Sequence, residues 1–281
     1  MPFLFSGQTL GVIGAGVMGQ TLLRGLLQCG LVDRSQAWAA ARTEDSCQKV
    51  STALGIQVEM DYRARVPSTA VLLLCVKPSQ MGSVLAKLQS AGLSPETLLI
   101  SIAAGDTIAQ LEATLGSKNP WVRAMPNTPC IVGEGMTVLA GGTNASDQHM
   151  QRARQIFEAV GKCRVVDESY FNAITALSGS GPAYIYLIIE SLADAGVRVG
   201  LPRELALSLV TQTMLGATTM VQASGRHPAS LRDDVTTPAG CTIAGLLMLE
   251  DGKIRSVLAR AIEEATRTAA GLGQTKVAAK S

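Results

Sequence analysis

The architecture of this chain is set by the residues Leu10-Gly11-Val12-Ile13-Gly14-Ala15-Gly16-Val17-Met18-Gly19. The apolar start of this stretch reads as a strand, and from Val17 onward apolar residues recur at helical spacing. Gly14, Gly16 and Gly19 match G-x-G-x-x-G, the pattern of the phosphate-binding turn in a Rossmann domain. We expect Gly14 to permit the turn, Gly16 to admit a pyrophosphate and Gly19 to let helix and strand pack closely. The amides of Val17 and Met18 at the helix start would face the phosphates.

Short apolar runs continue through the first half of the chain, separated by helical stretches such as residues 44–54. The runs lie at residues 37–41, 71–76, 98–102, 121–125 and 136–140. Strands that are apolar on both faces are typical of a parallel sheet covered by helices on each side. A helix at 146–160 and a strand at 164–166 would close the sheet. We therefore place an α/β, Rossmann-type dinucleotide-binding domain at residues 1–166.

The second half has no strand pattern and is expected to be all helical, forming a substrate-binding and dimerisation domain at residues 167–281. Helices are predicted at 182–199, 202–224, 240–249 and 253–271. The first of these carries apolar side chains around most of its circumference, at Ile185, Leu187, Ile188, Ile189 and Leu192. Such a helix must be buried. A compact bundle would bury it, but about 115 residues offer little interior, so we favour a bundle completed by a second subunit.

Composition excludes several classes of partner. The 24 Lys and Arg against 22 Asp and Glu give a net charge of +2, which indicates neither a nucleic-acid nor a membrane partner. No apolar run approaches the ~18–20 residues of a membrane span, and residues 1–7 lack the pattern of a signal peptide. The six cysteines show no CxxC and no paired histidine, so we expect no metal site, no disulfide framework and a cytoplasmic location.

The choice of dinucleotide depends on the end of the second strand. An NAD site usually has an acidic residue there, ~20 residues beyond the glycines, to bind the ribose 2′-hydroxyl. This chain has Arg42 and Thr43 instead, with no acid before Glu44. Arg42 could pair with a 2′-phosphate and Thr43 could add a hydroxyl, which favours NADP, with NADPH preferred over NADH. The alternative is that Arg42 is an ordinary exposed arginine.

Three further strand ends supply candidate cofactor contacts. Val76-Lys77-Pro78 follows one apolar run, where Pro78 is expected to end the strand and Lys77 either reaches the cofactor or lies in solvent. Ala103-Ala104-Gly105 follows the next run, and its small residues would let nicotinamide lie against the backbone. Asn127, with Thr128, follows a third run and either forms a turn or orients the nicotinamide or the substrate.

Two segments of the second half resemble anion sites at helix starts. Residues 177–182 are either an ordinary helix N-cap before Pro182 or an anion-receptive helix end. Residues 234–243 are richer, because the free amides of residues 239–243 would hold a carboxylate with help from the helix dipole. The substrate-binding residues predicted there are Thr237, Ala239, Gly240, Cys241 and Thr242.

The residue types at this second segment indicate a reaction that needs little acid–base help. Reduction of a cyclic imine fits, since a protonated C=N is already electrophilic, whereas reduction of a ketone more typically uses a Lys, His or Tyr proton donor. The two histidines, His149 and His227, are placed in a surface helix and a loop.

Several motifs together resemble the pyrroline-5-carboxylate reductase family over nearly the whole chain. They include Val76-Lys77-Pro78, Pro126-Asn127-Thr128-Pro129, Leu177-Ser178-Gly179-Ser180-Gly181-Pro182 and Thr236-Thr237-Pro238-Ala239-Gly240-Cys241-Thr242. The last differs from the family pattern by Ala239 in place of glycine and Cys241 in place of threonine, and the first of these matters if the position needs positive φ. The family's asparagine after the third strand has no clear match near Asp61.

The resemblance implies an N-terminal Rossmann domain, a C-terminal helical domain, interlocked dimers often assembled into decamers, and NAD(P)H-dependent reduction of Δ1-pyrroline-5-carboxylate to L-proline. It also implies that Thr242 is the catalytic threonine that hydrogen-bonds the ring nitrogen. Two alternatives remain. A β-hydroxyacid dehydrogenase shares this layout, but it uses a lysine in the first long helix of the second domain, and residues 182–197 contain none. A non-catalytic dinucleotide-binding sensor is the other.

Overall fold

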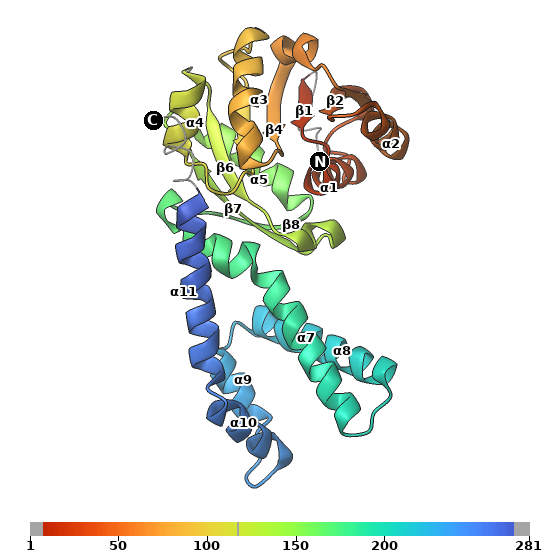
Figure 1. Cartoon of the computed structure of the whole chain (residues 1–281), viewed down its shortest axis with the longest axis vertical. Coiled ribbons are helices and arrows are strands. Elements are labelled where there is room, and N and C mark those ends of the chain that lie inside the picture. Colours follow the sequence, from red (N-terminus) through yellow and green to blue (C-terminus); the bar gives the residue numbers. More distant parts are fainter. Residues whose placement is uncertain (1–7, 117, 273–281) are drawn as a thin grey trace. The chain divides into compact units, whose positions relative to one another are not determined.

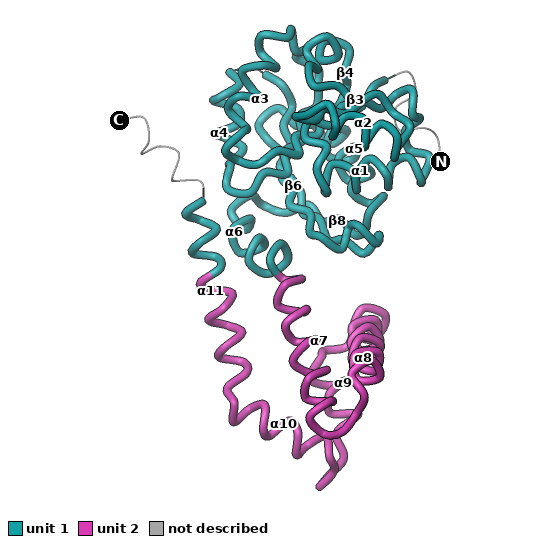
Figure 2. The backbone as a smooth tube through the Cα atoms, turned by 45° about the vertical axis from the view of Figure 1, so that its right-hand side comes forward, with its two compact units in different colours: residues 1–180, 265–281 teal, residues 181–264 magenta. Residues whose placement is uncertain are grey.

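The computed structural model of the 281-residue chain describes residues 8–116 and 118–272. The expectations for residues 1–7 and for the end of the chain beyond Leu272 lie outside the described residues. The chain divides into two compact units, one of residues 1–180 with 265–281 and one of residues 181–264 (Figure 2). These units are not the domains 1–166 and 167–281 expected above, which remain a prediction.

The first unit is built on one eight-stranded sheet with the order β3-β2-β1-β4-β5-β6-β7-β8 (Figure 1). The strands are β1 (Thr9–Ile13), β2 (Ala37–Ala40), β3 (Gln57–Glu59), β4 (Thr69–Leu74), β5 (Leu98–Ser101), β6 (Trp121–Met125), β7 (Gly135–Gly141) and β8 (Gly161–Val165). The strand order reverses beside β1, which lies between β2 and β4. Ligands of such sheets bind at the carboxyl ends of the strands near this reversal.

The expectation of an all-parallel sheet is wrong at one place. β7 runs antiparallel to β6, with Met125 paired to Val138, while every other neighbouring pair is parallel. Only a short 3-10 segment, η3 (Thr128–Val132), lies between the two strands. A parallel crossover needs a dozen or more residues and usually a helix, so the short connection returns the chain antiparallel.

Helices α1 (Val17–Gln28), α2 (Glu44–Leu54) and α5 (Asp147–Glu158) lie where the periodicity predicted them. The sequence analysis missed β3 and the helices α3 (Pro78–Ser90) and α4 (Ile108–Leu115). It was also wrong about Pro78, since β4 ends at Leu74 and Pro78 instead begins α3. Proline suits that first helical position because its missing N–H has no partner there in any case.

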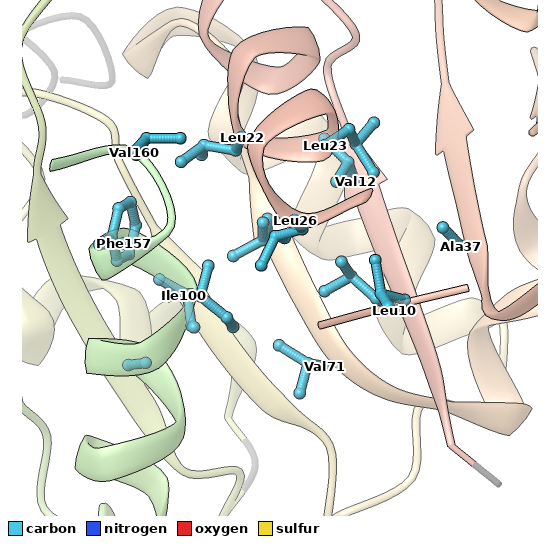
Figure 3. Close-up of a cluster of buried hydrophobic side chains, with 14 of the residues drawn as sticks. Leu10, Val12, Leu22, Leu23, Leu26, Ala37, Val71, Ile100, Phe157 and Val160 are labelled. Atoms are coloured by element: carbon cyan, nitrogen blue, oxygen red, sulfur yellow. The ribbon is translucent and has the colours of Figure 1, made fainter. Parts of the chain in front are cut away.

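Alternation along the strands produces a hydrophobic core on each face of the sheet. Leu10 and Val12 of β1 face the cluster that contains α1 and α5, while Ile13 belongs to the opposite cluster. On the first side, the leucines of α1 meet Phe157 and strand residues (Figure 3). Leu22, Leu23 and Leu26 are completely buried, and each contributes about 1.5–3 kcal/mol on transfer from water.

The helical unit contains α7 (Gly181–Arg198), α8 (Arg203–Ser224), α9 (Pro228–Asp234), α10 (Cys241–Asp251) and the first part of α11 (Ile254–Leu272). The four predicted helices are present, and the short helix α9 was missed. α7 and α8 pack together where Gly196 lies against Ala206, since a Cβ added to Gly196 would be 3.0 Å from the Cβ of Ala206.

The expected helix start within residues 177–182 is present, since α7 begins at Gly181, but it is not a free helix end. α6 (Phe171–Ile174) and a π-helical turn, η5 (Thr175–Gly179), already precede that point. The amide of Ser180 donates to the carbonyl of Thr175 at 2.8 Å, so it is not free to bind an anion.

Among the described residues, no helix is both long and apolar enough to cross a membrane.

Candidate functional site

The turn between β1 and α1 shows why each motif position is a glycine. Gly14 has φ +103°, and an added Cβ would lie 2.4 Å from the carbonyl oxygen of Cys75. A Cβ on Gly19 would lie 2.4 Å from the carbonyl oxygen of Gly14. A Cβ on Gly16 would meet nothing within 4 Å. Gly14 and Gly19 therefore make the close packing possible, and Gly16 leaves open space beside the turn.

A cavity of about 670 Å³ opens onto this turn at the carboxyl edge of the sheet. Its walls come from the β1–α1 turn, the ends of β2, β3 and β4, and one face of α3. The lining residues are Ile13, Gly14, Ala15, Gly16, Ala40, Ala41, Arg42, Thr43, Ser46, Met60, Tyr62, Cys75, Val76, Lys77, Gln80, Ser83, Val84 and Lys87. The volume is within the range of cofactor sites.

The charges of the cavity suit a polyanion. Arg42, Lys77 and Lys87 contribute to its lining, which includes no acidic residue among the described part of the chain. No side chain caps the first turn of α1, so the amides that follow Gly16 stay available to a phosphate. The residues present therefore fit a dinucleotide.

The β2 end places Arg42 and Thr43 as expected, in the wall of this cavity. The Thr43 hydroxyl is already engaged, because it accepts from the Ser46 amide at 3.2 Å and donates to the Ser46 Oγ at 2.8 Å. Thr43 is thus the N-cap of α2, and Arg42 is the side chain left for a ligand phosphate.

Five other predicted cofactor residues follow β1 or β4, and they differ in whether they line the cavity. Val76 and Lys77 line it, whereas Pro78 forms the first turn of α3 behind them. Val17 is 69% exposed and lines a separate groove of about 510 Å³. Met18 packs half-buried against the core. Of these, only Val76 and Lys77 are brought to the dinucleotide cavity by their side chains.

Ala103, Ala104 and Gly105 do not line the cavity. Ala103 is buried in the core, and Gly105 borders a smaller cavity of about 370 Å³ beside Arg123 and Glu168. Arg123 is itself buried, pairs with Glu168 at 2.9 Å and lies 4.5 Å from the ring centre of Phe171. The nicotinamide role of the three small residues stays a prediction.

Asn127 uses its whole amide group within the sheet unit. Its Oδ1 accepts from the Met136 amide at 2.9 Å, and its Nδ2 donates to the Ser178 carbonyl at 3.2 Å. These bonds join the end of β6 to β7 and to the π-helical turn. The structure therefore shows the turn-forming role of Asn127, and its contact with a cofactor stays a prediction.

Sequence reasoning missed the lining residues beyond β3 and on α3. Gln80, Ser83, Val84 and Lys87 face the cavity at spacing i, i+3, i+4 and i+7. This spacing is a helical signal, but it could be used only once residues 78–90 were assigned to a helix. Other missed residues follow β3 or lie in α2, at Ser46, Met60 and Tyr62, and the rest lie at the ends of β1, β2 and β4, at Ile13, Ala15, Ala40, Ala41 and Cys75.

Tyr62 is a buried aromatic residue in the lining of the cavity. It is 5% exposed, and its ring stacks on Trp38 with 6.1 Å between ring centres. Its hydroxyl is buried and has no hydrogen-bond partner among the described residues. Burial, with a smaller effect of Asp61, raises the pKa of Tyr62 to about 12, so the phenol is neutral at physiological pH.

The predicted substrate residues lie together at the start of α10. Gly240 is the N-cap and Cys241 and Thr242 are the first helical residues, with no capping side chain. The amide of Gly240 donates to the Thr237 carbonyl at 3.1 Å, so the expectation that this amide is free is wrong. Ala239 has φ +55°, a left-handed conformation that costs a non-glycine residue roughly 1–2 kcal/mol. Position 239 therefore has positive φ, so alanine in place of the glycine of the family pattern puts a non-glycine residue in a strained backbone conformation.

Other site chemistries are not assembled in the described part of the chain. There, no group of three His, Cys, Asp or Glu side chains could hold a metal ion. His149 caps α5 through Ser146, and the His227 ring accepts from the Ala229 amide at 3.2 Å. Neither histidine lines the dinucleotide cavity. Taken together, the Rossmann sheet, the glycine turn and the cation-lined cavity define a dinucleotide-binding protein.

Comparison with known proteins narrows this class. Residues 9–105 match the family described as NADP oxidoreductase coenzyme F420-dependent, and residues 168–272 match the one described as pyrroline-5-carboxylate reductase dimerisation. The chain is 41% identical over 266 residues to pyrroline-5-carboxylate reductase of Arabidopsis thaliana, covering 95% of this chain and 96% of the relative. It is 40% identical over 267 residues to that of Methanosarcina acetivorans, covering 95% and 98%.

Comparison with solved structures points to the same family. A pyrroline-5-carboxylate reductase from Coxiella burnetii is 34% identical with a TM-score of 0.88, covering 94% of this chain and 98% of that one. Plasmodium falciparum pyrroline carboxylate reductase, solved with NADP bound, is 32% identical with a TM-score of 0.85, covering 96% and 99%. The chain belongs to the pyrroline-5-carboxylate reductase family, whose members are NAD(P)H-dependent oxidoreductases. The resemblance seen in the sequence is thereby confirmed.

Proposed function

We propose that this chain reduces Δ1-pyrroline-5-carboxylate to L-proline, the last step of proline biosynthesis, and that it prefers NADPH to NADH. Membership of the family supports the reaction. The observation that supports the coenzyme preference is a dinucleotide cavity with Arg42 at the β2 end and no acidic residue in its lining. An acid there would bind a ribose 2′-hydroxyl and repel a 2′-phosphate.

The residues of the sheet unit bind and orient the cofactor. When bound, NADPH supplies the hydride that reduces the C=N bond. The Gly14–Gly16 turn and the free amides at the start of α1 hold the pyrophosphate, and the Arg42 guanidinium pairs with the 2′-phosphate. Val76 and Lys77 complete the wall at the end of β4.

The residues at the start of α10 recognise the substrate. The uncapped amides of Cys241 and Thr242 hold its carboxylate, with the positive end of the helix dipole beside them. The Thr242 hydroxyl hydrogen-bonds the ring nitrogen and is the catalytic residue. Thr237, Ala239 and Gly240 shape the loop that carries these groups. The imine needs no separate strong acid, because its protonated form is already electrophilic.

The active protein is a homodimer assembled through the helical unit. The match to a dimerisation family over residues 168–272 supports self-association, and so do the many large apolar side chains that α7, α8 and α10 leave exposed. Decamers, which the resemblance implies, would be built from these dimers. All six cysteines are free thiols, which favours the reducing cytoplasm as the location.

Oxidation of NADPH in the presence of Δ1-pyrroline-5-carboxylate tests the reaction directly. The matched assay offers NADP with a β-hydroxyacid in the reverse direction, which is the activity of the alternative class. α7 contains no lysine, so that second assay should show no turnover. Turnover only with the hydroxyacid would overturn the proposal, and binding of NADPH without turnover of either substrate would indicate a sensor.

A further inference from the structure

The face that α3 turns toward the dinucleotide cavity is polar for a helix that packs on a sheet. Gln80, Ser83 and Lys87 lie on it at spacing i, i+3 and i+7, beside Val84. The helix buries a separate apolar stripe of Met81, Leu85 and Leu88 in the core. α3 therefore has an apolar face that packs in the core and a polar face that lines the cavity, which we call the ligand face.

Lys87 is the charged residue of the ligand face. Within residues 8–116 and 118–272, no acidic side chain lies within 4.0 Å of its ammonium group to form an ion pair. Asp61 is nearby, but it is paired with Arg63 at 2.6 Å. Hydrogen bonds from Arg63 lower the pKa of Asp61 to about 2, with a smaller contribution from the charge of Lys87. Lys87 thus lies near the part of the cavity that Met60 and Tyr62 line.

Arg42 lines the same cavity from the end of β2, at the adenosine end of a Rossmann site. A phosphate monoester carries a charge of about −1.5 to −2 at neutral pH, so one guanidinium leaves part of it unbalanced. We propose that Lys87 on α3 is a second specificity-determining cation, which with Arg42 holds the 2′-phosphate of NADPH from a separate element of the fold. This proposal rests on the NADPH preference proposed above and assigns it a second residue.

Two features of Lys87 shape the expected effect. It is exposed, so its attraction for the phosphate is moderate and is screened by salt. It also lies in the last turn of α3, where a cation stabilises a helix. Removing the charge could therefore loosen α3 as well as weaken the phosphate contact. A loosened α3 would weaken NADPH and NADH alike, whereas a lost phosphate contact weakens NADPH alone.

The test measures dissociation constants for NADPH and NADH with the full chain, for the wild type, Lys87→Gln, Lys87→Arg and Arg42→Gln. Lys49→Gln is the control, since Lys49 is an exposed lysine of α2 outside the cavity lining. Lys87→Gln should raise the dissociation constant for NADPH about three- to tenfold and that for NADH less than about twofold. Lys87→Arg and Lys49→Gln should keep the wild-type ratio, and high salt should shrink the effect of Lys87→Gln.

Equal weakening of both cofactors in Lys87→Gln, or no change in either, would overturn the role of Lys87. If Arg42→Gln alone loses the NADPH preference, Lys87 has no part in it and the function proposed above stands. If the wild type binds NADPH and NADH equally well, both the preference and this inference fail. None of these binding measurements depends on turnover of the substrate.

Discussion

The two units of this chain differ in how much of their apolar surface they bury. The sheet unit encloses a hydrophobic cluster on each face, with side chains such as Leu10, Leu72 and Phe157 fully buried. Within residues 181–264, all of which the structure describes, the buried apolar side chains are Ala193 and Ala206. Large side chains on α7, α8 and α10 are exposed instead, and Leu187 and Leu215 are each 61% exposed.

This contrast shows which unit is complete within one chain. A patch of apolar surface this extensive marks an interaction site. The sheet unit forms its core within one chain, whereas we expect the helical unit to complete a core when another copy covers α7 and α8. We therefore expect an exposed apolar residue changed to glutamate to weaken self-association in the helical unit and to have little effect in the sheet unit.

The largest effect should come from placing a charge on α7. Leu187→Glu removes an apolar side chain worth about 1.5–3 kcal/mol from each copy and forces a carboxylate into the interface. Because a twofold dimer contains the change twice, its dissociation constant should rise at least about a hundredfold. Sedimentation across a concentration series measures this.

Val165→Glu is the control for this substitution. Val165 is 57% exposed at the end of β8 in the sheet unit, so it matches Leu187 in exposure but not in the expected partner. The Val165→Glu protein should keep the wild-type assembly and melting temperature. A Leu187→Glu protein that remained a dimer would contradict the assignment of the α7 face.

The next largest effect should come from Thr242, because we place substrate binding in the helical unit and cofactor binding in the sheet unit. Thr242→Ala should lower kcat/KM about ten- to a hundredfold, because a hydrogen bond to a charged group contributes about 1.5–3 kcal/mol. NADPH affinity should be unchanged, since the cofactor residues lie in the sheet unit. Thr242→Ser keeps the hydroxyl and should retain most activity. Steady-state kinetics and melting temperatures of both variants separate catalysis from packing, and normal kinetics in Thr242→Ala would exclude the catalytic role.

A smaller effect is expected in the sheet unit at Arg42. Arg42→Asp replaces a guanidinium that can donate two hydrogen bonds to a phosphate with a carboxylate that repels it. The KM for NADPH should rise about tenfold, while the KM for NADH changes little or falls. Equal increases for the two cofactors would show that Arg42 does not contact the 2′-phosphate.

The smallest effect concerns backbone strain in the helical unit. Helix ends in the left-handed conformation carry glycine in both units, as at Gly116 and Gly225, whereas Ala239 in the loop before α10 has φ +55°. Ala239→Gly relieves strain of roughly 1–2 kcal/mol, partly offset by about 0.4–1 kcal/mol from the freer unfolded chain. The variant should be slightly more stable in thermal unfolding. Destabilisation would mean that Ala239 has negative φ in solution.

Much of the sheet unit could be predicted from local patterns. β1, the glycine turn and α1 were predicted correctly because an apolar run, a glycine pattern and helical periodicity are properties of neighbouring residues. α3 was missed although its apolar stripe is regular, because Pro78 was interpreted as a strand end. That omission hid Gln80, Ser83 and Lys87, and with them one wall of the cavity.

The sequence was sufficient for the features that depend on residues close together in the chain. They are the glycine turn after β1, the position of the start of α10 and the apolar circumference of α7. The antiparallel pairing of β7, the use of the Asn127 amide inside the sheet unit, and the meeting of Arg42 and Lys87 at one cavity were decided only by tertiary structure. These depend on where separate elements come to lie, which is set by packing between residues far apart in the chain.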